Sequence, residues 1–298
     1  MGSPKYGPSK MEVKSAIKSG ARALVRSILA NEVIWKMTGS LAGFSPYLRV
    51  QRLVAAENRF QNKCAQLFAG SVVLDGPFSG LKYPSHAAYG SALYPKLMGF
   101  YESELHGVFS QFKSQPYRAI IDVGFAEGYY LVGLAKLFPG AHLWGFDTSP
   151  VAHALCADLA RANAISRGRL HLAYDATPSS LAPALAGRTL VICDCEGFEA
   201  QLFTPENTTL WGQSDIIIEC HDFAVSGVTA TLTHLLQGTH KTEIISSEEP
   251  ARKTNLVSAA VRSRFSAQEL TRLLNEGRPC RQDWIVASAK SAQSQFPS

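Results

Sequence analysis

The sequence predicts an α/β fold in which a mostly parallel sheet is covered by helices on both faces, and three observations predict it. Short and nearly continuous apolar runs recur in the 298-residue chain from residue 118 onward, at residues 118–123, 142–146, 170–174, 190–193 and 215–220. Segments with helical apolar spacing separate several of these runs, and continuous apolar strands between helices are typical of a parallel sheet buried on both faces. Hydrophobic residues make up 46% of the chain, which is enough to fill a core and excludes wholesale disorder.

The first part of the chain predicts helices and no strand. Residues 1–10 are rich in Gly, Pro and Ser and predict a flexible start. Residues 11–37 and 50–69 then carry apolar side chains at three- and four-residue steps, which indicates two helices.

A leader without long helices follows. Residues 71–101 alternate short apolar stretches with Gly, Pro and Tyr, which predicts strand, turn and loop, and helical spacing resumes over residues 101–112. Aromatic side chains gather in this leader and fit either a lid over a site or an extension of the core: Tyr83, Tyr89, Tyr94, Phe100 and Tyr101. We therefore expect three parts, namely a basic helical N-terminal segment (1–69), a leader or lid (70–105) and a core domain (106–298).

The core domain continues to alternate between helix and strand. Helical patterns cover residues 129–138 and 150–164 between the first three strands. Two further strands are predicted at residues 242–246 and 283–287. Between them, Ser266-Ala267-Gln268-Glu269 has the pattern of a capping box and predicts a helix that runs to about Leu274.

The positive charge of the chain is confined to its beginning. The net charge is +5, but residues 1–60 alone hold ten Lys and Arg against three Asp and Glu, so the remainder is slightly acidic. Enzymes that act on nucleic acid usually carry positive surface around the active site, so we expect no nucleic-acid partner. Basic residues at four-residue steps suit a helix on an acidic membrane surface or on a partner protein, or a solvated helix face, which we favour: Lys14, Lys18, Arg22 and Arg26.

Cysteine usage and hydropathy point to the cytoplasm. The sequence has no uncharged apolar run of eighteen residues and no compact apolar run before a cleavage site, so we expect neither a membrane span nor a secretory signal. Its six cysteines form no C-x-x-C pair, which favours free thiols in a reducing compartment. Strand alternation places Cys193 and Cys195 on the face opposite Asp194, where small buried side chains are expected.

Four of the predicted strands end on or beside an acid, namely Asp122, Asp147, Asp175 and Asp194. Ligands of doubly wound sheets lie beyond the carboxyl ends of the strands, and an acid that closes the second strand can accept both hydrogen bonds from ribose hydroxyls. Single acids and glycines are common at strand ends as helix caps and turn residues, so the argument depends on the ordered set.

The turn after the first strand indicates what kind of nucleotide-like ligand is bound. A dinucleotide fingerprint starting at Gly124 would need glycine at positions 126 and 129, where the chain has Ala126 and Tyr129. This departure disfavours NAD and FAD, and therefore a nicotinamide oxidoreductase. No phosphate-binding loop of the G-x-x-x-x-G-K-[ST] type is present either. The pattern D-x-G-x-A-x-G suits a ligand without phosphate and with a methionine-like tail, such as S-adenosylmethionine.

Three motifs resemble a known family. Residues 122–130 resemble the first motif of class I S-adenosylmethionine-dependent methyltransferases, and Asp194-Cys195-Glu196-Gly197-Phe198-Glu199 is similar to the D-x-E-G-x-E signature of the FkbM-like branch. Residues 216–221 are also similar to that branch, so the resemblance covers residues 117–222. It implies a doubly wound Rossmann-like methyltransferase sheet with an antiparallel last strand. It also implies methyl transfer to an oxygen, commonly a hydroxyl of a sugar, a glycan or a natural product.

The resemblance also implies a cofactor site for S-adenosylmethionine. Gly124, Ala126 and Gly128 would lie under the methionine tail, and Asp147 would bind the ribose hydroxyls. The further residues expected at the cofactor are Asp122, at the tail's amine, Glu127 and Tyr129, in the turn, and Asp175, near the adenine.

A hydroxyl is a poor nucleophile until its proton is taken, so a general base or a metal ion is expected. Asp194, Glu196 and His221 are the candidate catalytic residues, with His221 or Glu196 as the base. In a second interpretation, which we do not favour, Asp194, Glu219 and His221 hold a divalent cation. The alternative to an enzyme is a non-catalytic scaffold of the same fold that docks through its basic N-terminal helix.

Overall fold

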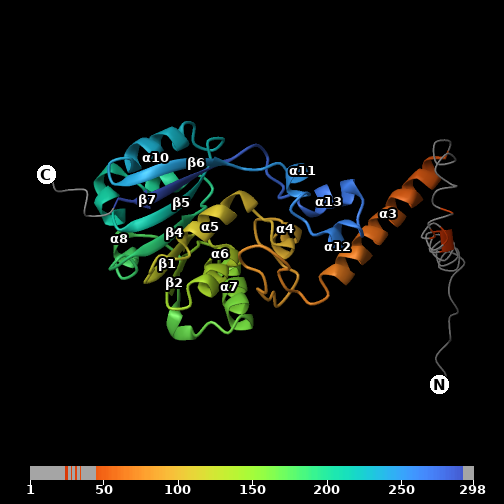
Figure 1. Cartoon of the computed structure of the whole chain (residues 1–298), viewed down its shortest axis with the longest axis horizontal. Helices are drawn as coiled ribbons and strands as arrows, with labels where there is room; N and C mark the ends of the chain where they lie inside the picture. Colours follow the sequence, from red (N-terminus) through yellow and green to blue (C-terminus); the bar gives the residue numbers. More distant parts are fainter. Residues whose placement is uncertain (1–23, 26–27, 29–30, 32–33, 35–44, 291–298) are drawn as a thin grey trace, which may run out of the picture. The chain divides into compact units, whose positions relative to one another are not determined.

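The computed structural model describes residues 24–25, 28, 31, 34 and 45–290 (Figure 1). These residues divide into two compact units between Ala69 and Gly70. The first unit contains helix α3 (Pro46–Leu67), which starts four residues before the predicted helix. The helix starts there because Ser45 caps its N-terminus: the Ser45 side chain accepts a hydrogen bond from the Leu48 N–H, and Pro46 occupies the first helical position. Most of the predicted helix over residues 11–37 lies outside the described residues.

The second unit is built on one seven-stranded sheet with the strand order β3-β2-β1-β4-β5-β7-β6. Its strands are β1 (Ala119–Val123), β2 (His142–Phe146), β3 (Leu170–Ala173), β4 (Thr189–Cys193), β5 (Ser214–Cys220), β6 (His240–Ser246) and β7 (Asp283–Ala289). The first five strands pair in parallel, whereas β7 runs antiparallel to both of its neighbours, β5 and β6. The predicted doubly wound sheet with an antiparallel last strand is thus confirmed.

Helices and short 3₁₀ turns connect the strands of this unit. They are α4 (Leu93–Met98), η2 (Ser103–Leu105), α5 (His106–Phe112), α6 (Tyr129–Leu137), α7 (Pro150–Ala162), η3 (Arg167–Arg169), α8 (Pro178–Leu181), α9 (Glu199–Leu202), η4 (Pro205–Trp211), α10 (Val228–Leu236), α11 (Pro250–Lys253), α12 (Ala259–Arg262) and α13 (Ala267–Leu273). The predicted capping box opens α13, where the side chains of Ser266 and Glu269 each accept the other's backbone N–H.

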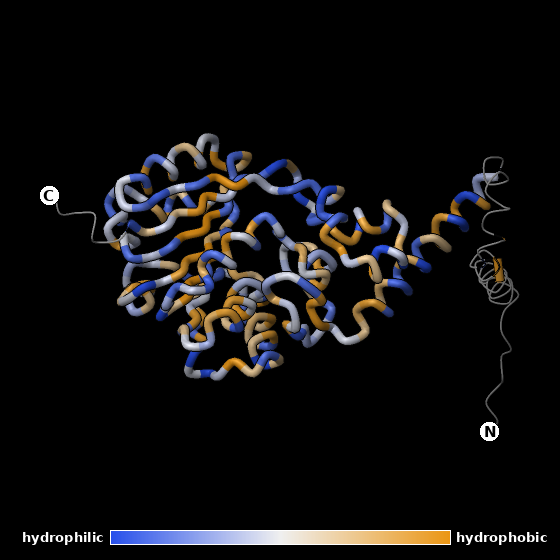
Figure 2. The backbone as a smooth tube through the Cα atoms, viewed as in Figure 1, coloured by the Kyte–Doolittle hydropathy of each residue, from blue (hydrophilic) through white to orange (hydrophobic). Residues whose placement is uncertain are grey.

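Helices cover both faces of the sheet. One face packs against α8, α9, η4 and α10, with Trp211 among the fully buried side chains of this layer. Helix α6 packs on β1 and β2, and every residue from Tyr129 to Ala135 in it is buried. Figure 2 shows the hydrophobic residues concentrated along the central strands, as expected for a sheet that is covered on both sides. No described helix carries an apolar stretch long enough to cross a bilayer.

The structure corrects two features of the prediction. The leader was expected to hold strand, turn and loop, but besides an isolated bridge between Val72 and Lys82 it forms helix α4. Helix α10 was not predicted, because its sequence VTATLTHLL is rich in β-branched residues that favour strands. Its helical signal is the burial of Val228, Leu232 and Leu236 at four-residue steps.

Candidate functional site

The turn after β1 has an unusual backbone in which every second residue is left-handed. The φ angles are +84° at Gly124, +50° at Ala126 and +92° at Gly128. A Cβ atom at Gly124 would lie 1.7 Å from the backbone oxygen of Asp194, so only glycine fits there. The Asp194 N–H in turn donates a hydrogen bond to the carbonyl of Val123, at 2.9 Å. The turn is therefore in direct backbone contact with the end of β4.

Asp122 lies under this turn and is 2% exposed. Its Oδ2 atom is buried and has no hydrogen-bond partner among the described residues. Burial raises the pKa of Asp122 to about 8, although a hydrogen bond from the Leu131 N–H acts in the opposite direction. An unpaired buried carboxylate oxygen at this place is suited to accept a hydrogen bond from a cationic or polar ligand group.

Asp147 closes β2 beside the same turn. Its Oδ2 atom accepts a hydrogen bond from the Ala126 N–H at 2.9 Å, and its Oδ1 atom accepts one from the Ser149 N–H at 2.8 Å. A carboxylate offers about four lone-pair sites, so about two stay available for ligand hydroxyls. Asp175 follows β3 and is exposed at this edge of the sheet.

The side chains of Glu127 and Tyr129 point to the leader. The Glu127 carboxylate forms a buried ion pair with Lys96, with 2.6 Å between Nζ and Oε1. It also accepts hydrogen bonds from the Tyr83 hydroxyl and the Tyr89 N–H, both at 3.2 Å. The Tyr129 ring makes edge-on contacts with aromatic rings of the leader, those of Phe78 and Tyr101. The observed contacts of Glu127 and Tyr129 hold the leader against the turn. Their predicted contacts with the cofactor stay predictions.

The leader aromatics extend the core at two of the five positions considered. Tyr83 is 4% exposed and Phe100 is 6% exposed, whereas Tyr89 is 38% exposed. Tyr101 packs edge-on against Tyr129, and burial, followed by the negative charges of Glu102, Asp194 and Glu219, raises its pKa well above the ordinary value.

An acid–histidine cluster lies where β4 and β5 end. His221 is 1% exposed, and its Nδ1 atom lies 2.7 Å from Oε1 of Glu199. Its Nε2 atom faces three further carboxylates, at 3.5 Å from Asp194 Oδ1, 3.5 Å from Glu196 Oε2 and 3.8 Å from Glu219 Oε2. The structure thus brings together the three predicted catalytic residues and Glu219.

The loop after β4 holds these groups in place through a strained turn. Glu196 has a φ of +54° and Gly197 a φ of +104°, so two left-handed residues follow each other. Glu199 is 0% exposed and accepts hydrogen bonds from the backbone N–H groups of Gly197, at 3.2 Å, and Cys195, at 3.4 Å. The Glu196 side chain is 76% exposed and lies at the mouth of the cluster. The thiols of Cys193 and Cys195 lie 3.4 Å apart on one face, as strand alternation predicted.

Burial and mutual repulsion set the protonation of the cluster. Burial, followed by the charge of Glu102, raises the pKa of Asp194 to about 7. Burial, followed by the charge of Asp194, raises the pKa of Glu219 well above its ordinary value. Burial lowers the pKa of His221, but the hydrogen bond and charge of Glu199 and the other carboxylates outweigh it, so the pKa is raised overall.

A network of buried ion pairs surrounds the cluster and was not predicted from the sequence. The Arg278 guanidinium pairs with Glu219, with Glu102 at 2.6 Å and with Glu276 at 2.9 Å. Lys253, which is 0% exposed, pairs with Glu276 at 2.5 Å and with a second leader acid, Glu104, at 3.0 Å. The network joins the leader to β5 and to the segment between β6 and β7. No local sequence pattern indicates it, because Glu102 and Arg278 are 176 residues apart.

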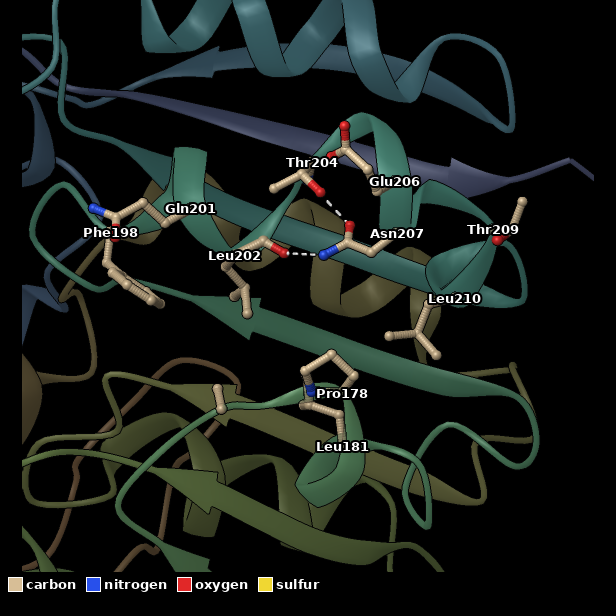
Figure 3. Close-up of a pocket in the computed structure, with 11 residues that line it drawn as sticks. Pro178, Leu181, Phe198, Gln201, Leu202, Thr204, Glu206, Asn207, Thr209 and Leu210 are labelled. Atoms are coloured by element: carbon tan, nitrogen blue, oxygen red, sulfur yellow. Dashed lines mark hydrogen bonds between the residues drawn. The ribbon is translucent and has the colours of Figure 1, made fainter.

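A surface groove of about 630 Å³ lies between α8 and η4 (Figure 3). Its lining includes Phe198, from the loop of Glu196, and Ala176, which follows Asp175. The side chain of Asn207 fixes its upper wall by donating a hydrogen bond to the Leu202 carbonyl, at 2.8 Å. The groove runs along the face of the sheet, and none of the strand-end acids line it. None of the predicted cofactor or catalytic residues therefore lies in this groove.

Comparison with known proteins gives distant structural similarities. No family model matches the sequence, and no curated protein matches it either. A precorrin-6y C5,15-methyltransferase from Geobacter metallireducens is similar at a TM-score of 0.41 and 10% identity, over 62% of this chain and 89% of that chain. A ribosomal protein L11 methylase from Lactobacillus delbrueckii subsp. bulgaricus gives a TM-score of 0.41 and 13% identity, over 71% and 86% of the two chains. An rRNA methylase from Streptococcus thermophilus gives a TM-score of 0.41 and 10% identity, over 63% and 97%.

Proposed function

We propose that this protein is an S-adenosylmethionine-dependent methyltransferase that methylates a hydroxyl group, as its resemblance to the FkbM-like branch implies. The observation that carries the proposal is the arrangement of backbone and polar groups at the carboxyl ends of β1 and β2. There, three left-handed residues line one turn and Asp147 keeps about two lone-pair sites for ribose hydroxyls. The strand order adds support, because ligands of such sheets lie beyond the carboxyl ends where the order reverses, here between β1 and β4.

The residues of the turn fit the cofactor. Gly124 and Gly128 let the turn pack closely on Asp194 and Cys156, where a Cβ atom would not fit, and Asp122 has an unpaired buried oxygen suited to the amine of the methionine tail. Asp147 would hold the ribose, and Asp175, exposed at the same edge, would lie near the adenine. When bound, S-adenosylmethionine supplies a methyl group that is activated by a positively charged sulfur.

The acid–histidine cluster would activate the acceptor. Glu196 is exposed at its mouth and can take the hydroxyl proton, while Asp194 and His221 orient the hydroxyl from the buried side. Glu199 fixes the ring of His221 by accepting a hydrogen bond from Nδ1. In this arrangement the protein contributes to catalysis mainly by orienting the acceptor hydroxyl, and less through the reactivity of a single side chain.

The charge of this edge favours a neutral acceptor. Within the described residues, the buried carboxyl groups of the cluster lie beside the cations Arg278, Lys253 and His221, and the raised pKa values of Asp194 and Glu219 reduce their negative charge near neutral pH. The exposed carboxylate of Glu196 at the mouth of the cluster would repel phosphate groups and the backbone of nucleic acids. We infer that the acceptor is a small molecule or glycan with uncharged hydroxyls.

Calorimetry with S-adenosylhomocysteine tests the proposal. We expect the wild-type protein to bind this product, and we expect Asp147→Ala to weaken binding at least tenfold. Asp158→Ala, which changes an exposed acid on α7, should bind like wild type. Absence of binding to the wild-type protein, or equal binding by Asp147→Ala, would overturn the assignment and favour a scaffold that keeps the fold without the cofactor.

A further inference from the structure

We propose that Asp194, Glu219 and His221 bind a divalent metal ion. One ligand atom from each residue lies within 4.8 Å of the other two. Two ligand atoms at about 2.2 Å from one ion are at most about 4.4 Å apart. The distances from His221 Nε2 to Asp194 Oδ1, 3.5 Å, and to Glu219 Oε2, 3.8 Å, already satisfy this limit.

The two atoms that face each other at the centre of this group make no hydrogen bond to the described residues. Within the part of the chain that the structure describes, Asp194 Oδ1 is a buried oxygen without a hydrogen-bond partner. The Nε2 atom of His221 makes no hydrogen bond to the described residues, although the residue is 1% exposed. Buried polar atoms are normally paired, so the unpaired Asp194 oxygen that faces His221 Nε2 points to a ligand between them.

The surroundings of His221 match those of a metal-bound histidine. Its Nδ1 atom is held by Glu199 Oε1 at 2.7 Å, and Glu199 is itself fixed by two backbone N–H groups. This carboxylate–histidine arrangement sets the tautomer that leaves Nε2 free, and it is typical of metal-binding histidines. The exposed carboxylate of Glu196 lies 3.5 Å from the same nitrogen and stays available to take a proton.

The donor set selects the class of ion. Arg278 binds Oε1 of Glu219 and so leaves Oε2 for the cluster. Two carboxylate oxygens and one imidazole nitrogen suit manganese, iron or zinc better than calcium, which prefers oxygen ligands alone. If the proposed function holds, on which this role rests, the ion lowers the pKa of an acceptor hydroxyl bound to it, and Glu196 accepts the proton.

Binding of Mn²⁺ to the full-length protein in the absence of cofactor is the test, measured by the loss of the free-ion signal in electron paramagnetic resonance. We expect one ion per chain in the wild-type protein, and at least tenfold weaker binding by Asp194→Asn and by His221→Ala. Glu199→Gln changes no ligand atom but removes the charged partner of His221, so it should weaken binding by about 10- to 100-fold. Asp158→Asn serves as the matched control and should bind like wild type.

The outcomes separate this proposal from the proposed function. Failure of the wild-type protein to bind Mn²⁺ and Zn²⁺, or equal binding by folded Asp194→Asn and Glu199→Gln, overturns the metal site. A protein that binds S-adenosylhomocysteine but neither ion keeps the proposed function and loses the metal. If the protein binds Mn²⁺ through these residues but does not bind S-adenosylhomocysteine, the metal site stands and the methyltransferase proposal is overturned.

Discussion

The buried ion pair between Lys96 and Glu127 offers the sharpest test of how the leader is attached to the turn after β1. The two side chains are 4% and 2% exposed, and their charged atoms lie 2.6 Å apart. In Lys96→Met the Glu127 carboxylate would stay buried with only the Tyr83 hydroxyl and the Tyr89 N–H as donors, both at 3.2 Å. Breaking a buried pair from one side typically costs about 3–5 kcal/mol, because an uncompensated charge is left behind.

Thermal unfolding followed by circular dichroism measures this cost. A loss of about 3–5 kcal/mol corresponds to a fall in Tm of roughly 6–20 °C for a domain of this size. The double variant Lys96→Met/Glu127→Gln should recover most of the loss, since no charge is then left unpaired. Arg161→Met is the control, because the side chains of Arg161 and Asp158 are 72% and 50% exposed. Breaking this exposed pair should change the free energy of unfolding by less than about 1 kcal/mol.

The result also decides between two roles for Glu127. If Glu127 serves the leader, Lys96→Met lowers Tm strongly and the double variant restores it. A fall of less than about 1 kcal/mol in Lys96→Met, or a double variant no more stable than the single one, would refute the reasoning from burial. If instead Glu127→Gln leaves Tm unchanged and weakens S-adenosylhomocysteine binding, its predicted contact with the cofactor is the role that matters.

Three further predictions concern the carboxyl edge of the sheet. Gly124→Ala should lose about 3 kcal/mol or more in urea unfolding, because its Cβ atom would lie 1.7 Å from the Asp194 carbonyl, whereas Gly140→Ala, which meets nothing within 4 Å, should change little. The free energy of unfolding of Asp122→Asn, measured relative to that of the wild-type protein, should rise between about pH 4 and pH 8 by up to about 1.4 kcal/mol per pH unit. The sign follows because the raised pKa, about 8, makes the folded state hold a proton that the unfolded state has released; equal pH profiles of unfolding would contradict it. Glu196→Gly should raise stability by about 1 kcal/mol through relief of the left-handed backbone, whereas Glu196→Gln, which keeps the side chain, should not.

The strands could be predicted because their signal is local. Continuous apolar runs locate β1 to β5 within about two residues, and the strand-end acids then follow from the order of the chain. The meeting of Asp194 with His221 was predictable for the same reason, because β4 and β5 are neighbours whose carboxyl ends reach one edge. Helix α10 was missed because its threonines and valine favour strands, and only tertiary packing makes it a helix.

The ion pairs around the site could not be predicted, because their partners are distant in sequence. Glu102 lies in the leader and Arg278 follows α13, yet they are 2.6 Å apart. Charged residues on a helix or loop are usually solvated, and nothing in the local pattern of Glu276 or Lys253 indicates burial. The role of Glu199 was missed in part for a related reason, since the sequence shows a third carboxylate in the loop but not the hydrogen bond to His221.

Backbone strain marks the same edge independently of the side-chain chemistry. Five non-glycine residues in the described part of the chain have positive φ, and three of them lie at this edge, namely Glu102, Ala126 and Glu196. Each left-handed residue costs on the order of 1 kcal/mol, so glycine would be the stable choice at all three positions. Glu102 is held by the Tyr130 hydroxyl and by Arg278, and Ala126 by Asp147. At Glu102 the left-handed backbone serves the ion-pair network that joins the leader to β5. At Glu196 it places an exposed carboxylate at the mouth of the acid–histidine cluster, where the proposed chemistry needs a base.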